Sequence, residues 1–331
     1  MDFKLIKPTI MKYIRLFIAS AIILTMVWSC TKYLDYNENT YYNKDNVFHS
    51  FGRTKAFLTN IYSYLPNDFS PLDGAMRSSA SDDAVHVYDL SAIVRFNNGS
   101  WSPIQTIDDQ WGNMYAGIRA VNLFLQEADI KKFGDIIYNS DYPQVVAQFN
   151  LYPYEARFLR AFFYFELIKR YGDVPLVTTV LTEQEANTIA RDPYDDIVKF
   201  IVSECDAISP ILPISFSTIT GAETGRATRG AALALKARTL LYAASPLHNP
   251  DNDQSKWIAA ATAAKAIMDN TTYSLEANYK NIVNNITSKE LIFETRQSAS
   301  NSFEVATFPI GYDGGNTGTC PTQNLVDTYE M

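Results

Sequence analysis

The stretch at residues 154–177, YEARFLRAFFYFELIKRYGDVPLV, constrains the fold of this chain more than any other. Its apolar side chains recur at helical spacing on one face (Phe158, Phe162, Phe165 and Ile168) and also fill the neighbouring face (Leu159, Phe163, Tyr164 and Leu167). A helix that is apolar on more than one side is packed on more than one side. Gly172 and Pro175 then end it, because glycine accepts a left-handed cap and proline cannot continue a helix. We therefore expect a central, buried helix.

Two arginines, Arg157 and Arg160, lie inside this aromatic run. A guanidinium group in a protein interior needs carboxylates or carbonyls to accept hydrogen bonds from its donors. Glu155 and Glu166 are the nearest candidates in the sequence. We interpret both arginines as internal struts that hold neighbouring helices, rather than as ligand contacts.

The remainder of the chain is also mainly helical in pattern. Apolar periodicity and stop signals predict helices over residues 51–65, 111–128, 193–210, 231–244 and 255–269. Asn122 lies on an apolar helical face, where we expect it to satisfy a backbone group. Thr228 is the expected cap of the helix at 231–244. These features predict an all-α fold with a few short strands.

Two segments depart from the helical pattern. Residues 290–295, ELIFET, have the pattern of a short strand, whereas residues 85–109 show no helical period and contain Gly99 and Pro103. Long irregular segments inside helical proteins are often functional surfaces. Residues 85–109 are therefore the first place where we expect a ligand.

Composition excludes several classes of protein. The 331 residues are 47% hydrophobic, which is enough for a sizeable core. A net charge of −8 and the absence of a Lys/Arg cluster argue against nucleic acid as a partner. The cysteines (Cys30, Cys205 and Cys320) and the histidines (His49, His86 and His248) lack the spacing of a zinc site or a catalytic triad. We therefore expect no metal, no cofactor, no enzymatic activity, and free or buried thiols at Cys205 and Cys320.

The N-terminus has the pattern of an export signal. Lys4, Lys7, Lys12 and Arg15 precede an uncharged apolar run at residues 16–27, which is too short to span a bilayer comfortably. The run ends in Ser29-Cys30, which resembles a bacterial lipobox. We expect a signal peptide at 1–29, lipid attachment at Cys30, a polar tether at 30–46 and a helical domain at 47–331. The alternative interpretation is an ordinary signal peptide, in which Cys30 carries no lipid.

Several separated segments carry a resemblance to one family. ARFLRAFFYFELIKRYGDVPLV, WGNMYAGIRAVNLFLQ and GRATRGAALALKARTLLYAASPLHN occur in the expected order and are similar to segments of SusD/RagB outer-membrane nutrient-binding lipoproteins. The resemblance implies a tetratricopeptide-like helical superhelix with long irregular loops. PTQNLVDTYEM resembles a segment that family members follow with a considerable further stretch, so we expect the domain at 47–331 to be C-terminally incomplete.

The resemblance also implies a function. Family members bind an oligosaccharide or polysaccharide, or a peptide in some relatives, at the outer face of the outer membrane and pass it to a SusC-like TonB-dependent transporter. Sugar recognition needs an aromatic platform flanked by amides and a guanidinium group. The loop region that supplies such groups in sugar-binding relatives contains Trp101, Asn97, Asn98, Arg95, Arg77 and Tyr88. These are the candidate ligand-binding residues.

Three alternatives remain open from the sequence. Trp101 could merely pack the loop onto the core. The chain could be a helical-repeat lipoprotein that acts as a protein-interaction scaffold and binds no nutrient. It could also be a lipid-anchored glycoside hydrolase, because its carboxylates are numerous enough to pair by chance.

Overall fold

The structure is a computed structural model that describes residues 13, 17, 43–69, 72–134, 136–215, 225–269, 272–282, 285, 288–295 and 300–329. The chain divides into two units, Met1–Asn46 and Val47–Met331. Cys30, nearly all of the expected signal peptide at 1–29 and most of the expected tether at 30–46 lie outside the described residues. The second unit holds the fold discussed below.

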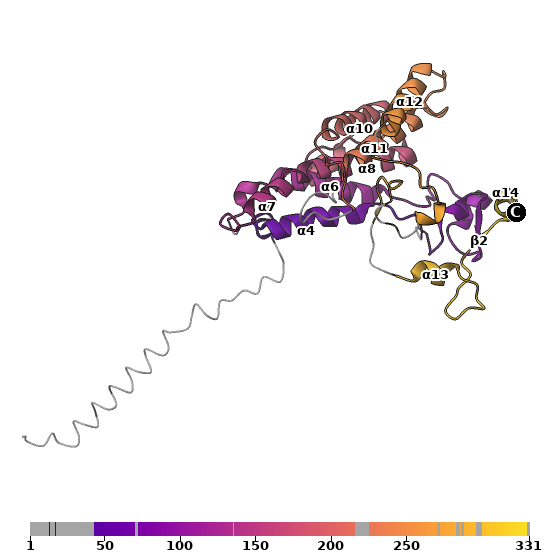
Figure 1. Cartoon of the computed structure of the whole chain (residues 1–331), viewed down its shortest axis with the longest axis horizontal. Coiled ribbons are helices and arrows are strands. Elements are labelled where there is room, and N and C mark those ends of the chain that lie inside the picture. Colours follow the sequence, from indigo (N-terminus) through magenta and orange to yellow (C-terminus); the bar gives the residue numbers. More distant parts are fainter. Residues whose placement is uncertain are drawn as a thin grey trace, which may run out of the picture. The chain divides into compact units, whose positions relative to one another are not determined.

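The second unit is mainly helical, as the sequence predicts (Figure 1). Its helices, with α3 starting just before it, are α3 Lys44–Phe48, α4 Phe51–Ile61, α5 Val94–Asn98, α6 Trp111–Glu127, α7 Tyr142–Phe149, α8 Tyr152–Tyr171, α9 Glu183–Thr188, α10 Tyr194–Ile208, α11 Arg229–Ala244, α12 Gln254–Met268, α13 Ser302–Thr307 and α14 Gln323–Thr328. Short 3-10 turns are η1 Tyr62–Tyr64, η2 Arg77–Ala80, η3 Ile130–Lys132 and η5 Tyr279–Asn281. Helices α6, α8, α10, α11 and α12 match the predicted ranges within about two residues, as is usual for helix ends. The helix predicted at 51–65 ends at Ile61 and continues as the 3-10 turn η1 to Tyr64.

Helix α8 is the centre of the helical part. It packs against α6 on one side and α10 on the other, α11 then packs on α10, and α12 packs on α11 (Figure 1). Phe158, Leu159, Phe163, Phe165 and Leu167 are almost fully buried, which confirms that this helix is covered on more than one face. Successive packing of antiparallel neighbours is the tetratricopeptide-like arrangement of the predicted fold class.

Polar groups at the helix borders are satisfied in the predicted way. The Asn122 side chain donates to the carbonyls of Val177 and Thr179, at 3.1 and 2.9 Å, and so fixes the strand-like segment that follows α8. The hydroxyl of Thr228 accepts from the Ala231 amide at 3.3 Å and caps α11. Gly172, at φ +69°, ends α8. The predictions for Asn122, for Thr228 and for the end of α8 at Gly172 are confirmed, whereas the predicted left-handed cap is not, because the ψ of Gly172 is −114°.

The partners predicted for the two arginines of α8 are wrong. Arg157 and Arg160 both pair with Glu204 of α10, with nitrogen–oxygen distances of 2.8 and 3.3 Å. Burial alone raises the pKa of Glu204, but the hydrogen bonds and charges of the two arginines outweigh burial and hold that pKa below its usual value. The two arginines therefore join α8 to α10, in agreement with a strut role.

Glu155 and Glu166 bind other groups instead. Glu155 is fully buried and accepts from Arg226, at 3.0 Å, and from the hydroxyl of Tyr62, at 2.9 Å. It thereby ties α8 to the segment before α11 and to η1. Glu166 binds Lys169 and Arg170 of its own helix, at 2.7 and 2.6 Å. The nearest carboxylate in sequence is therefore not the partner, because residues 155 and 166 point to other sides of α8.

The strand at 290–295 does not form. Phe293 instead packs its ring on Phe158 and Phe162 of α8, at centroid distances of 5.2 and 6.2 Å. In the described part of the chain, the strands are β1 Ala84–His86 and β2 Thr319–Pro321, which pair antiparallel with Val85 opposite Cys320. The irregular segment 85–109 also contains α5, whose five residues are too few for a visible helical period.

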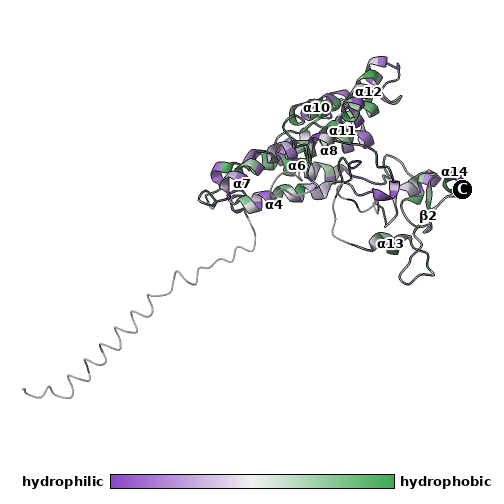
Figure 2. Ribbon diagram, viewed as in Figure 1, coloured by the Kyte–Doolittle hydropathy of each residue, from purple (hydrophilic) through white to green (hydrophobic). Residues whose placement is uncertain are grey.

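Cys205 is buried in α10 and Cys320 lies in β2, and both carry free thiols, as expected. None of the helices in the described part of the chain combines the length and apolar character needed to cross a bilayer. Hydrophilic and hydrophobic residues are interleaved along the labelled helices (Figure 2).

A close approach between α6 and α8 leads to a test of their packing. A Cβ added at Gly117 of α6 would lie 2.7 Å from the ring of Phe163, which is fully buried in α8. Gly117→Ala should therefore lower the free energy of unfolding by about 1–2 kcal/mol, because overpacking outweighs the gain in helix propensity. Gly112→Ala, in the same helix with nothing within 4 Å, should be neutral or stabilising. Urea denaturation of the full chain measures both, and an equal effect of the two changes would contradict this packing.

Candidate functional site

The predicted ligand region, residues 85–109, forms an irregular surface together with residues 77–84, and we call residues 77–109 the loop surface. Trp101 lies on it and is 53% exposed, and its ring contacts Phe96 at a centroid distance of 6.0 Å. The contact with Phe96 of α5 holds one part of the indole, while the exposed part remains open to solvent. Trp101 is therefore supported from within its own segment.

The two asparagines shape the turn that leads to Trp101. The side chain of Asn97 donates to the carbonyl of Ser79 at 3.1 Å, which ties α5 to η2. The Asn98 oxygen accepts from the Ser100 amide at 2.9 Å. Gly99, at φ +69°, ends α5 in the left-handed conformation that glycine adopts at little cost. Each asparagine uses one polar atom for the fold and keeps the other atom for further contacts.

Arg95 is the exposed cation of this surface. No hydrogen bond or ion pair joins its side chain to any residue that the structure describes. It lies on α5, six residues before Trp101 in sequence. Arg95, Asn97, Asn98 and Trp101 thus occur together on one short helix and the turn after it.

Tyr88 and Arg77 are engaged elsewhere. The hydroxyl of Tyr88 donates to the Asn316 carbonyl at 2.6 Å, so that this side chain joins the loop surface to the segment before β2. Arg77 binds the carboxylates of Asp68 and Asp108, at 2.6 and 2.8 Å. Both of its ion pairs hold the loops, and Arg77 acts as a structural cross-link in this arrangement.

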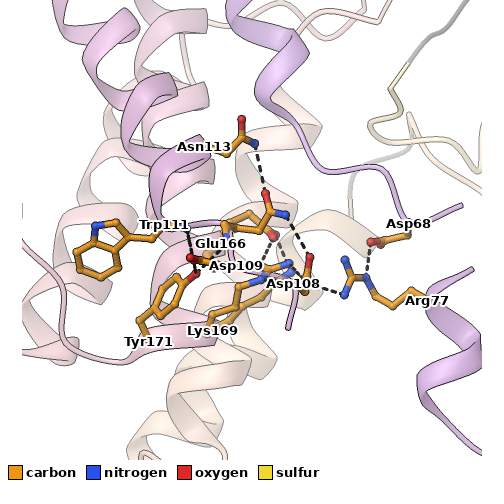
Figure 3. Close-up of polar contacts among 11 residues, drawn as sticks. Asp68, Arg77, Asp108, Asp109, Trp111, Asn113, Glu166, Lys169 and Tyr171 are labelled. Carbon is orange, nitrogen blue, oxygen red and sulfur yellow. Dashed lines mark hydrogen bonds and ion pairs between the residues drawn. The ribbon is translucent and has the colours of Figure 1, made fainter. Parts of the chain in front are cut away.

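Asp108 is the centre of a charged network that joins the loop surface to α8 (Figure 3). Its side chain is 6% exposed and accepts from Arg77 of η2 and from Arg170 of α8, at 2.8 and 3.0 Å. Arg170 in turn binds Glu166 at 2.6 Å. One buried carboxylate therefore fixes two arginines from different parts of the chain.

The electrostatics of Asp108 favour its charged form. Burial raises the pKa of a carboxyl group, but the hydrogen bond from Arg77 and the charge and hydrogen bonds of Arg170 outweigh burial and hold the pKa of Asp108 below its usual value. Asp108 also has a left-handed backbone, at φ +56°, which aspartate tolerates better than most residues. The ion pairs hold this sharp bend in place.

A second contact fixes the start of α6. The hydroxyl of Tyr171, the last residue of α8, accepts from the amides of Gln110 and Trp111 at 2.8 and 2.9 Å. It donates to Asp109 at 2.6 Å (Figure 3). This hydrogen bond and the one from the Trp111 amide lower the pKa of Asp109. Tyr171 thus caps α6 from another helix.

Sequence reasoning did not assign roles to Asp108, Arg170 and Tyr171. The signal that was available is the Asp108-Asp109 pair just before a helix, which is a common place for capping carboxylates. The partners Arg170 and Tyr171 follow 62 residues later in each case, and no local pattern indicates that separation.

Two histidines of the described part of the chain have lowered pKa values. Burial lowers the pKa of both His86, in β1, and His248, whose ring stacks on Tyr194 at 3.6 Å. Over the residues that the structure describes, no group of three or more His, Cys, Asp or Glu side chains is arranged to hold a metal ion.

Two of the cavities among the described residues adjoin the helices. One, of about 290 Å³, lies among α8, α11, residues 65–68 and residues 292–295. The other, of about 280 Å³, lies between α6 and the segment 175–189 and is lined mainly by apolar side chains, with Trp111 and Tyr115 among them. Hydrogen bonds of Tyr115 to Pro175 and of Arg119 to Leu181, at 2.8 and 2.9 Å, brace the walls of this second cavity.

The Asp108 network predicts a specific pH dependence. Asp108→Asn should lower the free energy of unfolding at pH 7 by about 2–3 kcal/mol, because two arginines lose a buried anionic partner. The pKa of Asp108 is depressed in the fold, so its stabilisation is complete above the unfolded value of about 3.9 and is lost as pH falls through the lower folded value. The difference in the free energy of unfolding between wild type and Asp108→Asn should therefore become smaller below about pH 4.

Urea denaturation of the full chain at pH 7 and at pH 3 measures this gap. Asp89→Asn, an exposed change in the same loop surface, is the matched control and should alter stability little at either pH. A gap for Asp108→Asn that is absent at pH 7, or equally large at both pH values, would contradict the role of the network.

Comparison with known proteins agrees with this architecture. Residues 32–241 match a family described as SusD-like, starch-binding and associating with the outer membrane. A SusD-like protein of Formosa agariphila is 24% identical over 213 residues, which are 63% of this chain and 36% of that protein. The chain belongs to the SusD-like family.

Solved structures from Bacteroides fragilis share the fold. One SusD-like protein is 26% identical, with a TM-score of 0.67, over 87% of this chain and 54% of its own. A SusD-like carbohydrate binding protein is 28% identical, with a TM-score of 0.65, over 86% of this chain and 54% of its own. The chain thus spans about half the length of these two structures.

Proposed function

We propose that this protein binds an oligosaccharide or polysaccharide at the loop surface. The observation that carries the proposal is Trp101, which is half exposed and held by Phe96 beside the exposed Arg95. An exposed indole offers an apolar face to a sugar ring, and a guanidinium group and amides donate hydrogen bonds to its hydroxyls. Asn97 and Asn98 complete this set, whereas Tyr88 and Arg77 position the surrounding loops.

The family supports a carbohydrate as the ligand. Its description names starch binding and the outer membrane, and one structural relative from Bacteroides fragilis is described as carbohydrate binding. Under the proposal the protein is a binding protein and not an enzyme. A peptide ligand, known for some members of the wider family, is the second candidate at the same surface.

The proposal includes the location and the partner. Residues 1–29 serve as signal peptide, Cys30 carries the lipid, residues 30–46 form the tether, and residues 47–331 form the SusD-like domain, to which further chain belongs in the longer relatives. The lipid holds the protein on the outer membrane, facing the exterior. There it passes its ligand to a SusC-like TonB-dependent transporter. The basic residues and the apolar run before Cys30 support this part of the proposal.

Trp101→Ala tests the binding surface. A glycan array with the full chain first identifies the oligosaccharide that binds best, and calorimetry then measures its affinity. The variant should bind about tenfold more weakly, because loss of one stacking contact costs roughly 1.4 kcal/mol. Its stability should change little, since Trp101 lies outside the core. Trp257→Ala, on α12, is the matched control and should leave the affinity unchanged.

Each alternative predicts a different result. Unchanged affinity of Trp101→Ala would contradict the proposed surface. A protein that binds no glycan but co-purifies with unrelated proteins would support the scaffold. Release of new reducing ends from the bound glycan would instead indicate a glycoside hydrolase.

A further inference from the structure

The cavity of about 290 Å³ among α8, α11 and residues 65–68 and 292–295, which we call the α8–α11 cavity, has aromatic walls. The rings of Phe158 and Phe162 of α8 contact Phe293, at centroid distances of 5.2 and 6.2 Å, so that three aromatic side chains gather on one side. Its volume is near the lower end of the range of about 300–1,000 Å³ that is typical of small-molecule sites. The cavity therefore suits a single ring better than a chain.

The polar wall of this cavity is part of the network drawn in Figure 3. Asp68, Glu166 and Lys169 line the cavity and also belong to that network. Within this network, three carboxylates (Asp68, Asp108 and Glu166) alternate with three cations (Arg77, Arg170 and Lys169) in consecutive ion pairs of 2.6–3.0 Å, while the fourth carboxylate, Asp109, accepts from Tyr171. The formal charges of these six ion-paired side chains cancel, and Asp109 does not line the cavity.

Arg238 of α11 adds a cation beyond this balance. It lines the cavity, and its guanidinium group lies 5.6 Å from the ring centre of Phe165. The ammonium group of Lys169 lies 5.6 Å from the same ring, but Glu166 neutralises it. In the described part of the chain, no carboxylate lies within 4 Å of the Arg238 nitrogens. Among the described residues that line the cavity, Arg238, which is exposed, is thus the cation without an anionic partner, in a protein whose net charge is −8.

These features of the cavity favour a ligand of a particular chemical class. A guanidinium group matches the two oxygens of a carboxylate in a planar, bidentate pair. Aromatic rings match the apolar face of a pyranose ring. A sugar ring that carries a carboxylate satisfies both walls at once, whereas a neutral sugar leaves Arg238 unpaired.

We propose that the α8–α11 cavity is a second saccharide subsite that takes a uronic acid residue, with Arg238 pairing with its carboxylate and Phe162 and Phe293 against its ring. This subsite is separate from the Trp101 surface and deepens the proposed function by naming the sugar class. It rests on the proposal that the protein binds glycans.

Monosaccharides test the subsite, because one ring fills it. The full chain is titrated with galacturonate and glucuronate, and with galactose and glucose as their neutral counterparts, and binding is followed by ligand-observed NMR. At least one uronate should bind more tightly than its neutral counterpart. Arg238→Gln should weaken that binding at least about tenfold, the loss expected for a charge-assisted pair, and should leave the neutral sugars unaffected.

Lys236→Gln is the matched control, because Lys236 lies on the same helix and pairs with Asp206 outside the cavity. It removes the same charge and should not change uronate binding. Three results would each overturn the subsite. They are an unchanged uronate affinity in Arg238→Gln, an equal loss of uronate affinity in Arg238→Gln and Lys236→Gln, and no uronate binding by the wild type.

Trp101→Ala separates this inference from the proposed function. Uronate binding that survives in Trp101→Ala and is lost in Arg238→Gln supports the α8–α11 cavity, whatever the glycan array finds. Uronate binding that is lost in Trp101→Ala and kept in Arg238→Gln assigns the uronate to the loop surface and overturns the subsite, while the proposed function stands.

Discussion

Charged side chains buried on α8 are the constraint on which the rest of this structure depends. Glu155, Arg160 and Glu166 are each less than a tenth exposed, and an unpaired charge in such a place costs several kcal/mol. Each therefore requires a partner from a different direction. Glu155 takes Arg226 before α11, Arg160 takes Glu204 of α10, and Glu166 takes Arg170, which reaches on to Asp108. The aromatic core buries the charged side chains of α8, and their ion pairs determine which segments lie against this helix.

The loop surface follows from the same constraint. Asp108 holds Arg77 of η2 as well as Arg170, and Asn97 joins η2 to α5, from which Trp101 follows. A continuous series of contacts thus runs from the buried Glu166 to an exposed indole. A buried network on α8 therefore holds the position of the loop surface, and under the proposed function this preorganisation lowers the entropy lost on ligand binding.

How far the sequence predicts this structure depends on the range of each interaction. The long helices, the cap at Thr228 and the stop at Gly172 were predictable, because their signals lie within a few residues. Trp101 could be singled out because it stands in an irregular segment. Glu204 and Asp108, which bind Arg160 and Arg170 from other segments, could not be predicted as partners. They lie 44 and 62 residues away in the sequence, and many carboxylates compete for the same role. The strand predicted at 290–295 was wrong because a strand pattern does not say whether a partner strand is present.

Amide hydrogen exchange in Arg170→Met tests most directly whether the buried network holds the loop surface. Methionine keeps much of the aliphatic bulk but removes the link between Glu166 and Asp108. Exchange should become faster at the amides of Arg77, Gln105 and Trp111, whose acceptors lie in the loops or on Tyr171, while α10 and α11 stay protected. Unchanged exchange at these amides, or an equal rise throughout the helices, would contradict the account.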